Sequence, residues 1–308
     1  MSLWQHYHTP STVSEALATL TGYDGAARVV SGGTDLLIEM QQGRAPTVEA
    51  RVEVTRIDAL RALRYEGDYI VIGAAVTHAE IVASPLLQTD ATCLVESCGV
   101  VGGPQVRSVA TLGGNVAHAL PAADGTIALL ALDAQAQVAR WVEGQAELGS
   151  WQPLSTLFAG PGRSTVDATR ELIVAFRVRC GESRGGATAL RVGSAFGRIM
   201  RPQGVALPIL GMAVRVTLAG DDSLHDVAIA VGPAGPVPFR AHATENTLRG
   251  RHAADAIDEA IRCLQDEAHV RTSPYRATAR YRQEMLAVLL RETLPRALAR
   301  AKEMFHHA

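Results

Sequence analysis

The chain has 308 residues, which suits two domains or one large domain with a clear subdivision. Apolar residues make up 47% and charged residues 19%, so a substantial core can form and long disorder is not expected. The formal net charge of -2 gives no electrostatic reason to expect nucleic acid or an anionic membrane as partner. The longest apolar stretch, residues 205–216, contains Pro208 and is too short to span a membrane. The N-terminus lacks the basic and apolar regions of a signal peptide, so we expect a cytoplasmic protein.

Strands and helices alternate over the first 180 residues. Apolar residues recur at helical spacing in 12–20, where Ser11 or Thr12 would cap the helix. The same patterns predict strands at 27–30, 50–54 and 69–72, and helices at 36–40, from 79 to the break at Ser84 and Pro85, at 91–100 and at 126–132. The alternation is typical of an α/β or α+β domain.

A polar, glycine-rich segment from Gly181 to Gly186 marks the predicted linker, residues 181–190. Strand-like runs at 207–218 and 226–231 then precede helices at 253–268 and 274–305, the last with Pro295 inside, which is an α+β arrangement. Tyr281, Met285 and Val288 recur at helical spacing and are expected in the core. Basic residues of the last helix are expected on a solvated face, or on a face that docks a partner subunit: Arg276, Arg280, Arg282, Arg291, Arg296, Arg300 and Lys302.

The four cysteines are scattered, at Cys93, Cys98, Cys180 and Cys263. A disulfide framework is not expected at this density, and an iron–sulfur cluster needs four closely placed thiolates. We expect the thiols to be small buried side chains. The histidines show no metal-ligand spacing, so we expect no metal site. No serine lies in a GxSxG turn, so we predict no catalytic triad and no catalytic residue.

The first chemical signal is the glycine loop Ser31, Gly32, Gly33, Thr34 and Asp35, between a predicted strand and a predicted helix. Glycines let the backbone approach a ligand closely, and free N–H groups at a helix start favour a phosphate. The loop lacks the three spaced glycines of the Rossmann pattern. A Gly-Gly pair also occurs simply as a tight turn, so this loop alone does not decide between the two.

A second glycine loop contains Thr111, Gly113, Gly114 and Asn115, and Asp124 follows it. Thr111 and Asn115 offer hydrogen bonds beside the glycines, and Asp124 could accept hydrogen bonds from a ribose or ribityl chain. Two such loops in one domain suit a pyrophosphate held from two sides. His118 could touch this ligand, although a capping role is favoured. Arg107 could anchor the loop or face the pyrophosphate, and the structural role is favoured.

Motifs along nearly the whole chain resemble the FAD-binding medium subunit of molybdenum hydroxylases, the group of carbon monoxide, xanthine and aldehyde dehydrogenases. SGGTDLLIEM resembles the first FAD motif, IGAAVTHAEI the connection that follows, and GPQVRSVATLGGNVAHALPAADGTIALLALDA the second FAD motif. LFAGPGRS and ELIVAFRV resemble the end of the FAD domain. FRAHATENTLRG and YRATARYRQEMLAVLL are similar to the C-terminal domain of the family. The order of the motifs is preserved.

The resemblance implies an α+β fold with an FAD-binding domain of the vanillyl-alcohol-oxidase (PCMH) type over 1–180, in subdomains of about 1–57 and 58–180. A C-terminal domain of the CO dehydrogenase flavoprotein type would cover 191–308. Residues 31–35 and 111–115 would hold the FAD pyrophosphate mainly through backbone N–H groups, and Asp124 the sugar portion. Leu172 or Ile173 would line the flavin or adenine. Phe196 and Arg198 stand where the family has a tyrosine and a lysine, and Arg198 is a candidate cofactor contact that keeps the positive charge.

The resemblance further implies an electron-transfer role. FAD would take electrons from the [2Fe–2S] clusters of a small subunit and pass them to an external acceptor, while substrate oxidation would occur at the molybdopterin of a large subunit. A dimer of heterotrimers is expected. The alternatives are a self-sufficient FAD oxidase or dehydrogenase of the same fold, for which the sequence offers no general base, and a scaffold that has lost FAD, against which both intact glycine loops argue.

Overall fold

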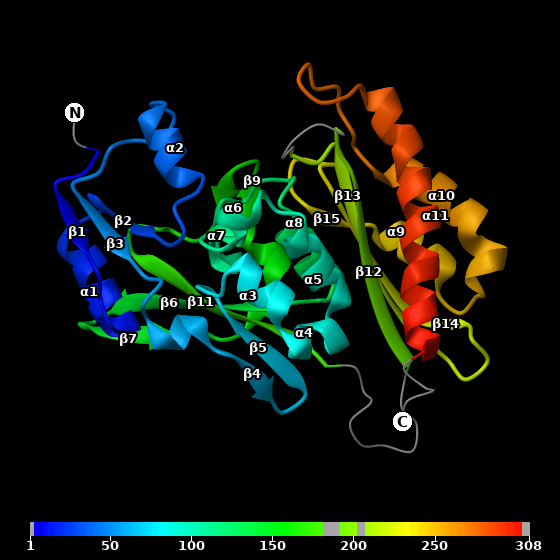
Figure 1. Ribbon diagram of the computed structural model, residues 1–308, viewed down its shortest axis with the longest axis horizontal. Helices are drawn as coiled ribbons and strands as arrows, with labels where there is room; N and C mark the ends of the chain where they lie inside the picture. The colour runs from blue at the N-terminus through cyan, green and yellow to red at the C-terminus, as the bar shows by residue number, and fades with distance from the viewer. Residues whose placement is uncertain (1–2, 181–190, 202–206, 304–308) are drawn as a thin grey trace.

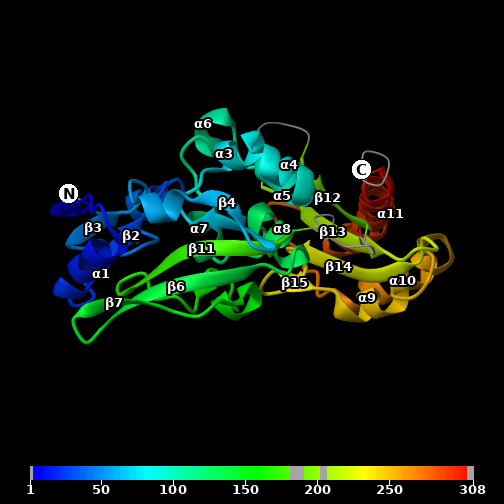
Figure 2. The same ribbon diagram turned by 90° about the horizontal axis from the view of Figure 1, so that it is seen from below.

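The computed structural model describes residues 3–180, 191–201 and 207–303. Three units follow one another along its length, an N-terminal unit, a middle unit and a C-terminal unit (Figure 1). Each is built on its own sheet, and short helices fill the space between the middle and C-terminal sheets (Figures 1 and 2). The predicted linker, 181–190, lies outside the described residues.

The N-terminal unit is a three-stranded parallel sheet with one helix packed on a face of it. Its elements are β1 (His6–His8), α1 (Val13–Gly22), β2 (Ala27–Val30), α2 (Leu36–Gln41) and β3 (Ala50–Glu53), with the strands in the order β1-β3-β2. Thr12 starts α1 by accepting the Glu15 N–H, at 3.1 Å. The apolar side of α1 is completely buried through Ala16, Leu17 and Leu20.

The middle unit contains a six-stranded antiparallel sheet. Its strands are β4 (Leu63–Glu66), β5 (Tyr69–Gly73), β11 (Glu171–Arg179), β6 (Gln135–Val142), β7 (Gln145–Leu148) and β8 (Gln152–Pro153), beside a separate pair, β9 (Phe158–Gly160) and β10 (Arg163–Ser164). Its helices are η1 (Asp58–Arg61), α3 (His78–Ala83), α4 (Pro85–Asp90), α5 (Thr92–Gly99), α6 (Pro104–Arg107), α7 (Leu112–Ala117), α8 (Asp124–Ala131) and η2 (Leu154–Leu157). The last strand of the unit, β11, lies between β5 and β6 and so joins the two parts of the sheet.

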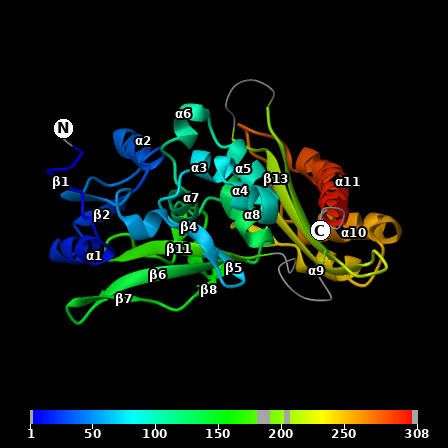
Figure 3. The ribbon, with the colours of Figure 1, turned by 60° about the horizontal axis from the view of Figure 1, so that its bottom comes forward.

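The C-terminal unit is a four-stranded antiparallel sheet with helices on both faces (Figures 1 and 3). Its elements are β12 (Arg191–Ile199), β13 (Leu210–Leu218), β14 (Leu224–Gly232), β15 (Phe239–Arg240), α9 (His242–Leu248), α10 (Ala253–Glu267) and α11 (Ala279–Glu303). Helix α11 packs on one face, and α5 and α8 of the middle unit pack on the other. All eight residues of α8 are buried, and one apolar cluster joins them to Phe196, Ala213 and Ala230.

The expected orientation of α11 is wrong. Tyr281 and Val288, predicted in the core, are 40% and 44% exposed, while Arg282, predicted in solvent, is 3% exposed. The buried stripe runs instead through Leu286, Leu289, Leu290 and Leu294. Met285 is partly buried and packs against this core, as predicted, whereas Tyr281 and Val288 lie beside the buried stripe, so their spacing was correct for a helix but did not mark its inner face. The helix also begins at Ala279 rather than 274.

Part of the arginine face of α11 binds the same chain. Arg296 and Arg300 both pair with Glu96 of α5, the latter at 2.6 Å. Arg296 also donates to the Phe196 carbonyl, and Arg300 to the Ser194 carbonyl. These two arginines therefore hold the C-terminal unit to the middle unit, which corrects the expectation of a solvated face for them, whereas Arg280 and Arg291 are exposed as expected.

Candidate cofactor site

The first glycine loop, loop 1 (residues 31–35), connects β2 to α2, and its glycines serve different purposes. Gly33 has a φ of +67°, a backbone conformation that favours glycine. Gly32 lies so close to the backbone of residues 109 and 110 that a Cβ would come within 2.2 Å of the Val109 carbonyl oxygen. Gly32 thus lets loop 1 pack against the segment that leads into the second loop.

Loop 1 offers free backbone donors. The N–H groups of residues 32–36 have no hydrogen-bond acceptor among the described residues, and the N-cap residue of α2, Asp35, makes no capping bond with its side chain. Such N–H groups at the start of a helix suit a phosphate. The backbone of loop 1 can therefore receive an anion.

The second glycine loop, loop 2 (residues 111–115), has a different geometry. The backbone N–H groups of residues 112–115 already have acceptors: that of Gly113 donates to the Ala74 carbonyl at 2.8 Å and that of Gly114 to Thr111 Oγ1 at 3.1 Å. Loop 2 therefore offers fewer free N–H groups to a ligand than loop 1 does. Thr111 Oγ1 also donates to Ser31 Oγ at 3.0 Å, so the two loops meet through their hydroxyl groups.

The two glycines of loop 2 also differ. Gly113 is buried, and a Cβ there would come within 2.6 Å of the Ala74 carbonyl oxygen. Gly114 is exposed, and its Cβ would meet only Thr111 Oγ1, at 3.2 Å. Gly113 is therefore required for packing, whereas Gly114 presents a bare backbone surface. Asn115 accepts the N–H of Thr126 and so joins α7 to the start of α8.

Asp124 and Arg198 form a buried ion pair between the middle and C-terminal units. Asp124 Oδ2 lies 2.7 Å from Arg198 Nη1, and the two side chains are 5% and 8% exposed. Burial raises the pKa of Asp124 to about 6, although the charge and hydrogen bond of Arg198 act in the opposite direction. The other carboxylate oxygen, Oδ1, is buried with no hydrogen-bond partner. A hydroxyl group of a ligand would satisfy it.

The remaining predicted residues lie around this centre. Leu172 and Ile173 are neighbours on β11 but belong to separate core clusters, and both are buried. Phe196 is buried between the two larger sheets, and its N–H donates to Glu96 Oε2 at 2.7 Å. Arg107 donates to the carbonyls of residues 101 and 102, so it anchors the approach to loop 2 as expected.

Two histidines have distinct surroundings. His78 is buried beside Cys98, with Nδ1 and Sγ 3.2 Å apart, and burial together with the charge of Arg107 lowers its pKa to about 4. It is therefore neutral at pH 7. His118, the C-cap of α7, lies across from α2, with Nε2 at 3.1 Å from Glu39 Oε1. Glu39 was not singled out from the sequence, because a single glutamate on a helix face carries no signal of its partner.

The cysteine thiols should be unreactive in the folded protein. Cys93, Cys98 and Cys180 are buried and Cys263 is partly exposed. Burial raises the pKa of Cys93 to about 12 and raises that of Cys98 further. With a thiol reagent at pH 8, we expect at most Cys263 to react promptly and the other three to react only after unfolding. Prompt modification of Cys93 or Cys98, located by mass spectrometry, would contradict this packing.

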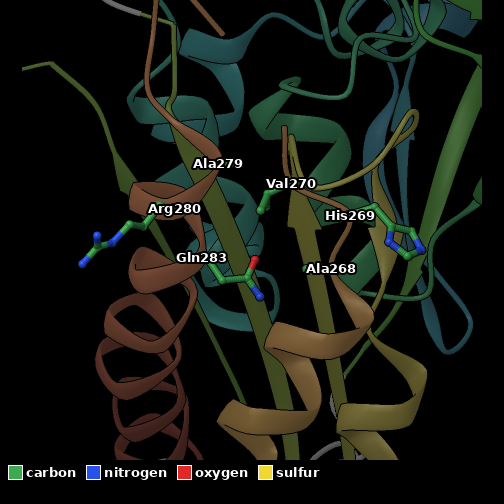
Figure 4. Close-up of a pocket in the computed structure, with 6 residues that line it drawn as sticks. All are labelled: Ala268, His269, Val270, Ala279, Arg280 and Gln283. Atoms are coloured by element: carbon green, nitrogen blue, oxygen red, sulfur yellow. The ribbon is translucent and has the colours of Figure 1, made fainter. Parts of the chain in front are cut away.

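A depression of about 440 Å³ lies elsewhere, between the end of α10 and the start of α11. Figure 4 shows Gln283 pointing into it and Arg280 pointing away. The residues that line it are Ala268, His269, Val270, Ala279, Arg280 and Gln283. All of them belong to the C-terminal unit, so this depression is separate from the glycine loops. Among the described residues, no three acidic, histidine or cysteine side chains come together as a metal site, and no helix is long and apolar enough to cross a membrane.

Comparison with known proteins connects this geometry to a family. Residues 3–178 match the family described as "FAD binding domain in molybdopterin dehydrogenase", and residues 194–297 match "CO dehydrogenase flavoprotein C-terminal domain". The chain belongs to this family. FAD is its cofactor, and it is a flavoprotein component of an oxidoreductase.

Relatives in the family are similar over their full length. The chain is 28% identical to the carbon monoxide dehydrogenase medium chain of Hydrogenophaga pseudoflava, over 96% of this chain and 97% of that protein. It is 25% identical to the xanthine dehydrogenase FAD-binding subunit of Escherichia coli O157:H7, over 96% of both. The solved carbon monoxide dehydrogenase from H. pseudoflava superposes with a TM-score of 0.84 and 26% identity, over 96% of this chain and 97% of that chain. These likenesses confirm the expected α+β flavoprotein fold.

The site fits FAD in three ways. The free N–H groups of residues 32–36 suit its pyrophosphate, the bare backbone at Gly114 permits close approach, and Asp124 Oδ1 lacks a donor that a sugar hydroxyl could supply. Bound FAD supplies the exchange of electrons, which no side chain of the site can perform.

Proposed function

We propose that this chain is the electron-transfer subunit of a molybdenum hydroxylase complex in the cytoplasm. Its FAD would receive electrons from the [2Fe–2S] clusters of a small subunit and release them to an external acceptor. A large subunit would carry molybdopterin and oxidise the substrate, and the whole would be a dimer of heterotrimers. The full-length similarity to a "medium chain" and an "FAD-binding subunit" supports this more than any other observation.

The chain's own residues would bind and orient the cofactor in this role. Residues 31–35 would hold the pyrophosphate through N–H groups, beside Thr111 and Gly114, and Asp124 would bind a sugar hydroxyl. Arg198, fixed to Asp124, would place a positive charge on the C-terminal side of the site. Leu172 and Ile173 would support the flavin or adenine from β11. None of these residues is a general base in a substrate pocket, which favours electron transfer over self-sufficient oxidation.

The test begins with the purified chain alone. We expect one non-covalent FAD per chain, released by acid, and reduction of the flavin by dithionite but not by aldehydes, purines or carbon monoxide. Adding the molybdenum and iron–sulfur subunits should give substrate-dependent flavin reduction, measured by bleaching near 450 nm. Flavin reduction by one of these substrates in the lone chain, at the rate of the complex, would establish the self-sufficient oxidase instead. A colourless chain that takes up no FAD would establish a scaffold.

A further inference from the structure

Two carboxylates stand beside the free N–H groups of loop 1. Asp35 and Glu39 are one helical turn apart, and no lysine or arginine among the described residues forms an ion pair with either. Both lie beside His118 of α7, with Nε2 3.1 Å from Glu39 Oε1 and Nδ1 3.7 Å from Asp35 Oδ2. The His118 side chain is 24% exposed, so it is partly shielded from solvent.

These carboxylates oppose the binding of an anion at the same helix start. The pyrophosphate of FAD is negatively charged, and like charges a few ångströms apart repel one another even near a protein surface. A protonated imidazole between α2 and α7 offsets that repulsion and also ties the two glycine loops together. A neutral imidazole keeps the hydrogen bond but leaves both carboxylates uncompensated.

We propose that His118 is a positioning residue for FAD, and that its positive charge, set between Asp35 and Glu39, is required for tight binding of the pyrophosphate. This inference rests on the proposed position of the pyrophosphate between loops 1 and 2. FAD affinity should then be higher at pH 6 than at pH 8, because the bound pyrophosphate favours the charged imidazole.

The backbone holds His118 firmly in this place. Its N–H donates to the Gly114 carbonyl at 3.0 Å, and the next residue, Ala119, accepts the Gly162 N–H at 3.0 Å. Other charged groups on the elements that pack against α7 are Asp124 of α8 and Glu171, Arg177 and Arg179 of β11. Asp124 is paired with Arg198 and Arg177 donates to Gln135, whereas His118 lies within ion-pair distance of both α2 carboxylates, Asp35 and Glu39.

The experiment measures FAD affinity of the full-length apo-protein by flavin fluorescence, between about pH 6 and about pH 8. The wild type should lose about five-fold in affinity across this range, the size expected for a partly exposed charge pair. His118→Gln keeps a hydrogen-bond donor toward Glu39 but no charge. It should bind about five-fold more weakly than the wild type at pH 6 and lose less affinity between pH 6 and pH 8, keeping only the pH dependence that comes from other groups such as Asp124, whose pKa is about 6.

Glu39→Gln provides an independent variant. Removing one carboxylate should raise affinity at pH 8 by about three-fold over the wild type, an effect that damage to the fold would not produce. His242→Gln is the matched control, because His242 makes a similar bond to a glutamate, Glu245, at 3.1 Å in the C-terminal unit. It should leave both affinity and profile unchanged.

The outcomes separate the inference from the proposed function. If the wild type binds FAD with the same affinity at all pH values, or His118→Gln keeps the wild-type profile, His118 is only a structural bridge and the inference is overturned. If the wild type binds no FAD at any pH, the proposed function fails instead.

Discussion

Replacing Gly114 by alanine should weaken FAD binding about ten- to hundred-fold, the effect of forcing a methyl group into a close contact. Without FAD, the new Cβ meets only Thr111 Oγ1, at 3.2 Å. Alanine is also favoured over glycine within a helix, so the stability of the FAD-free protein should change by less than about 1 kcal/mol. Fluorescence titration with FAD and urea unfolding of the apo-protein measure the two effects separately.

Gly22→Ala is the control for this substitution. Gly22 also lies in a helix, α1, and nothing lies within 4 Å of its Cβ position. It should leave FAD affinity unchanged. Gly33 is less suitable as a probe, because its φ of +67° makes any side chain strained whether or not FAD binds there. Wild-type affinity in Gly114→Ala would remove loop 2 from the proposed pyrophosphate site.

Replacing Glu96 by glutamine should lower the free energy of unfolding by about 2–4 kcal/mol. The substitution removes a largely buried negative charge that pairs with two arginines. The Glu96 side chain is 23% exposed and accepts from Arg296, Arg300 and the Phe196 N–H. Although burial acts to raise its pKa, the hydrogen bonds from Arg300 and Phe196 and the arginine charges lower it overall.

The pH dependence of this loss of stability follows from the direction in which the pKa of Glu96 is shifted. A carboxyl group with a lowered pKa in the folded state stabilises the protein above its unfolded pKa, and this stabilisation is lost as the pH falls through the folded value. The difference in the free energy of unfolding between the wild type and Glu96→Gln, measured with urea, should therefore be largest at pH 7 and decrease in acid. Glu292→Gln is the matched control, since Glu292 pairs with the same Arg296 at 3.5 Å on the surface, and it should cost less than about 0.5 kcal/mol. Equal losses in the two variants would show that Glu96 does not hold the units together.

Local patterns in the sequence identified most of the elements that carry the site. Strand β2 and the starts of α2 and β5 match the expected residues, because each lies between clear glycine or polar boundaries. Loop 1 lies between β2 and α2, whereas loop 2 forms the first turn of α7, and the two meet through Ser31 and Thr111. A family resemblance spread over nearly the whole chain pointed to FAD, and the family match agrees with it.

Features that depend on contacts between residues far apart in the chain could not be predicted from the sequence. The position of β11 between β5 and β6 depends on long-range pairing, for which local periodicity carries no information. Gly113 is needed for packing and Gly114 is not, and this difference depends on the position of Ala74. The inner face of α11 was misjudged because an arginine can be buried when its donors reach a carbonyl, as Arg282 reaches that of Pro233 at 3.2 Å.

Helix α8 has a consequence for the order in which the protein forms. Residues 3–178 and 194–297 match two separate domains, yet α8 packs against β13 and β14 and shares one apolar cluster with Ala213 and Ala230. On the ribosome, the first part emerges before the strands that cover this helix. Its apolar surface must stay uncovered until about a hundred further residues have been added, which makes the half-made chain a substrate for chaperones.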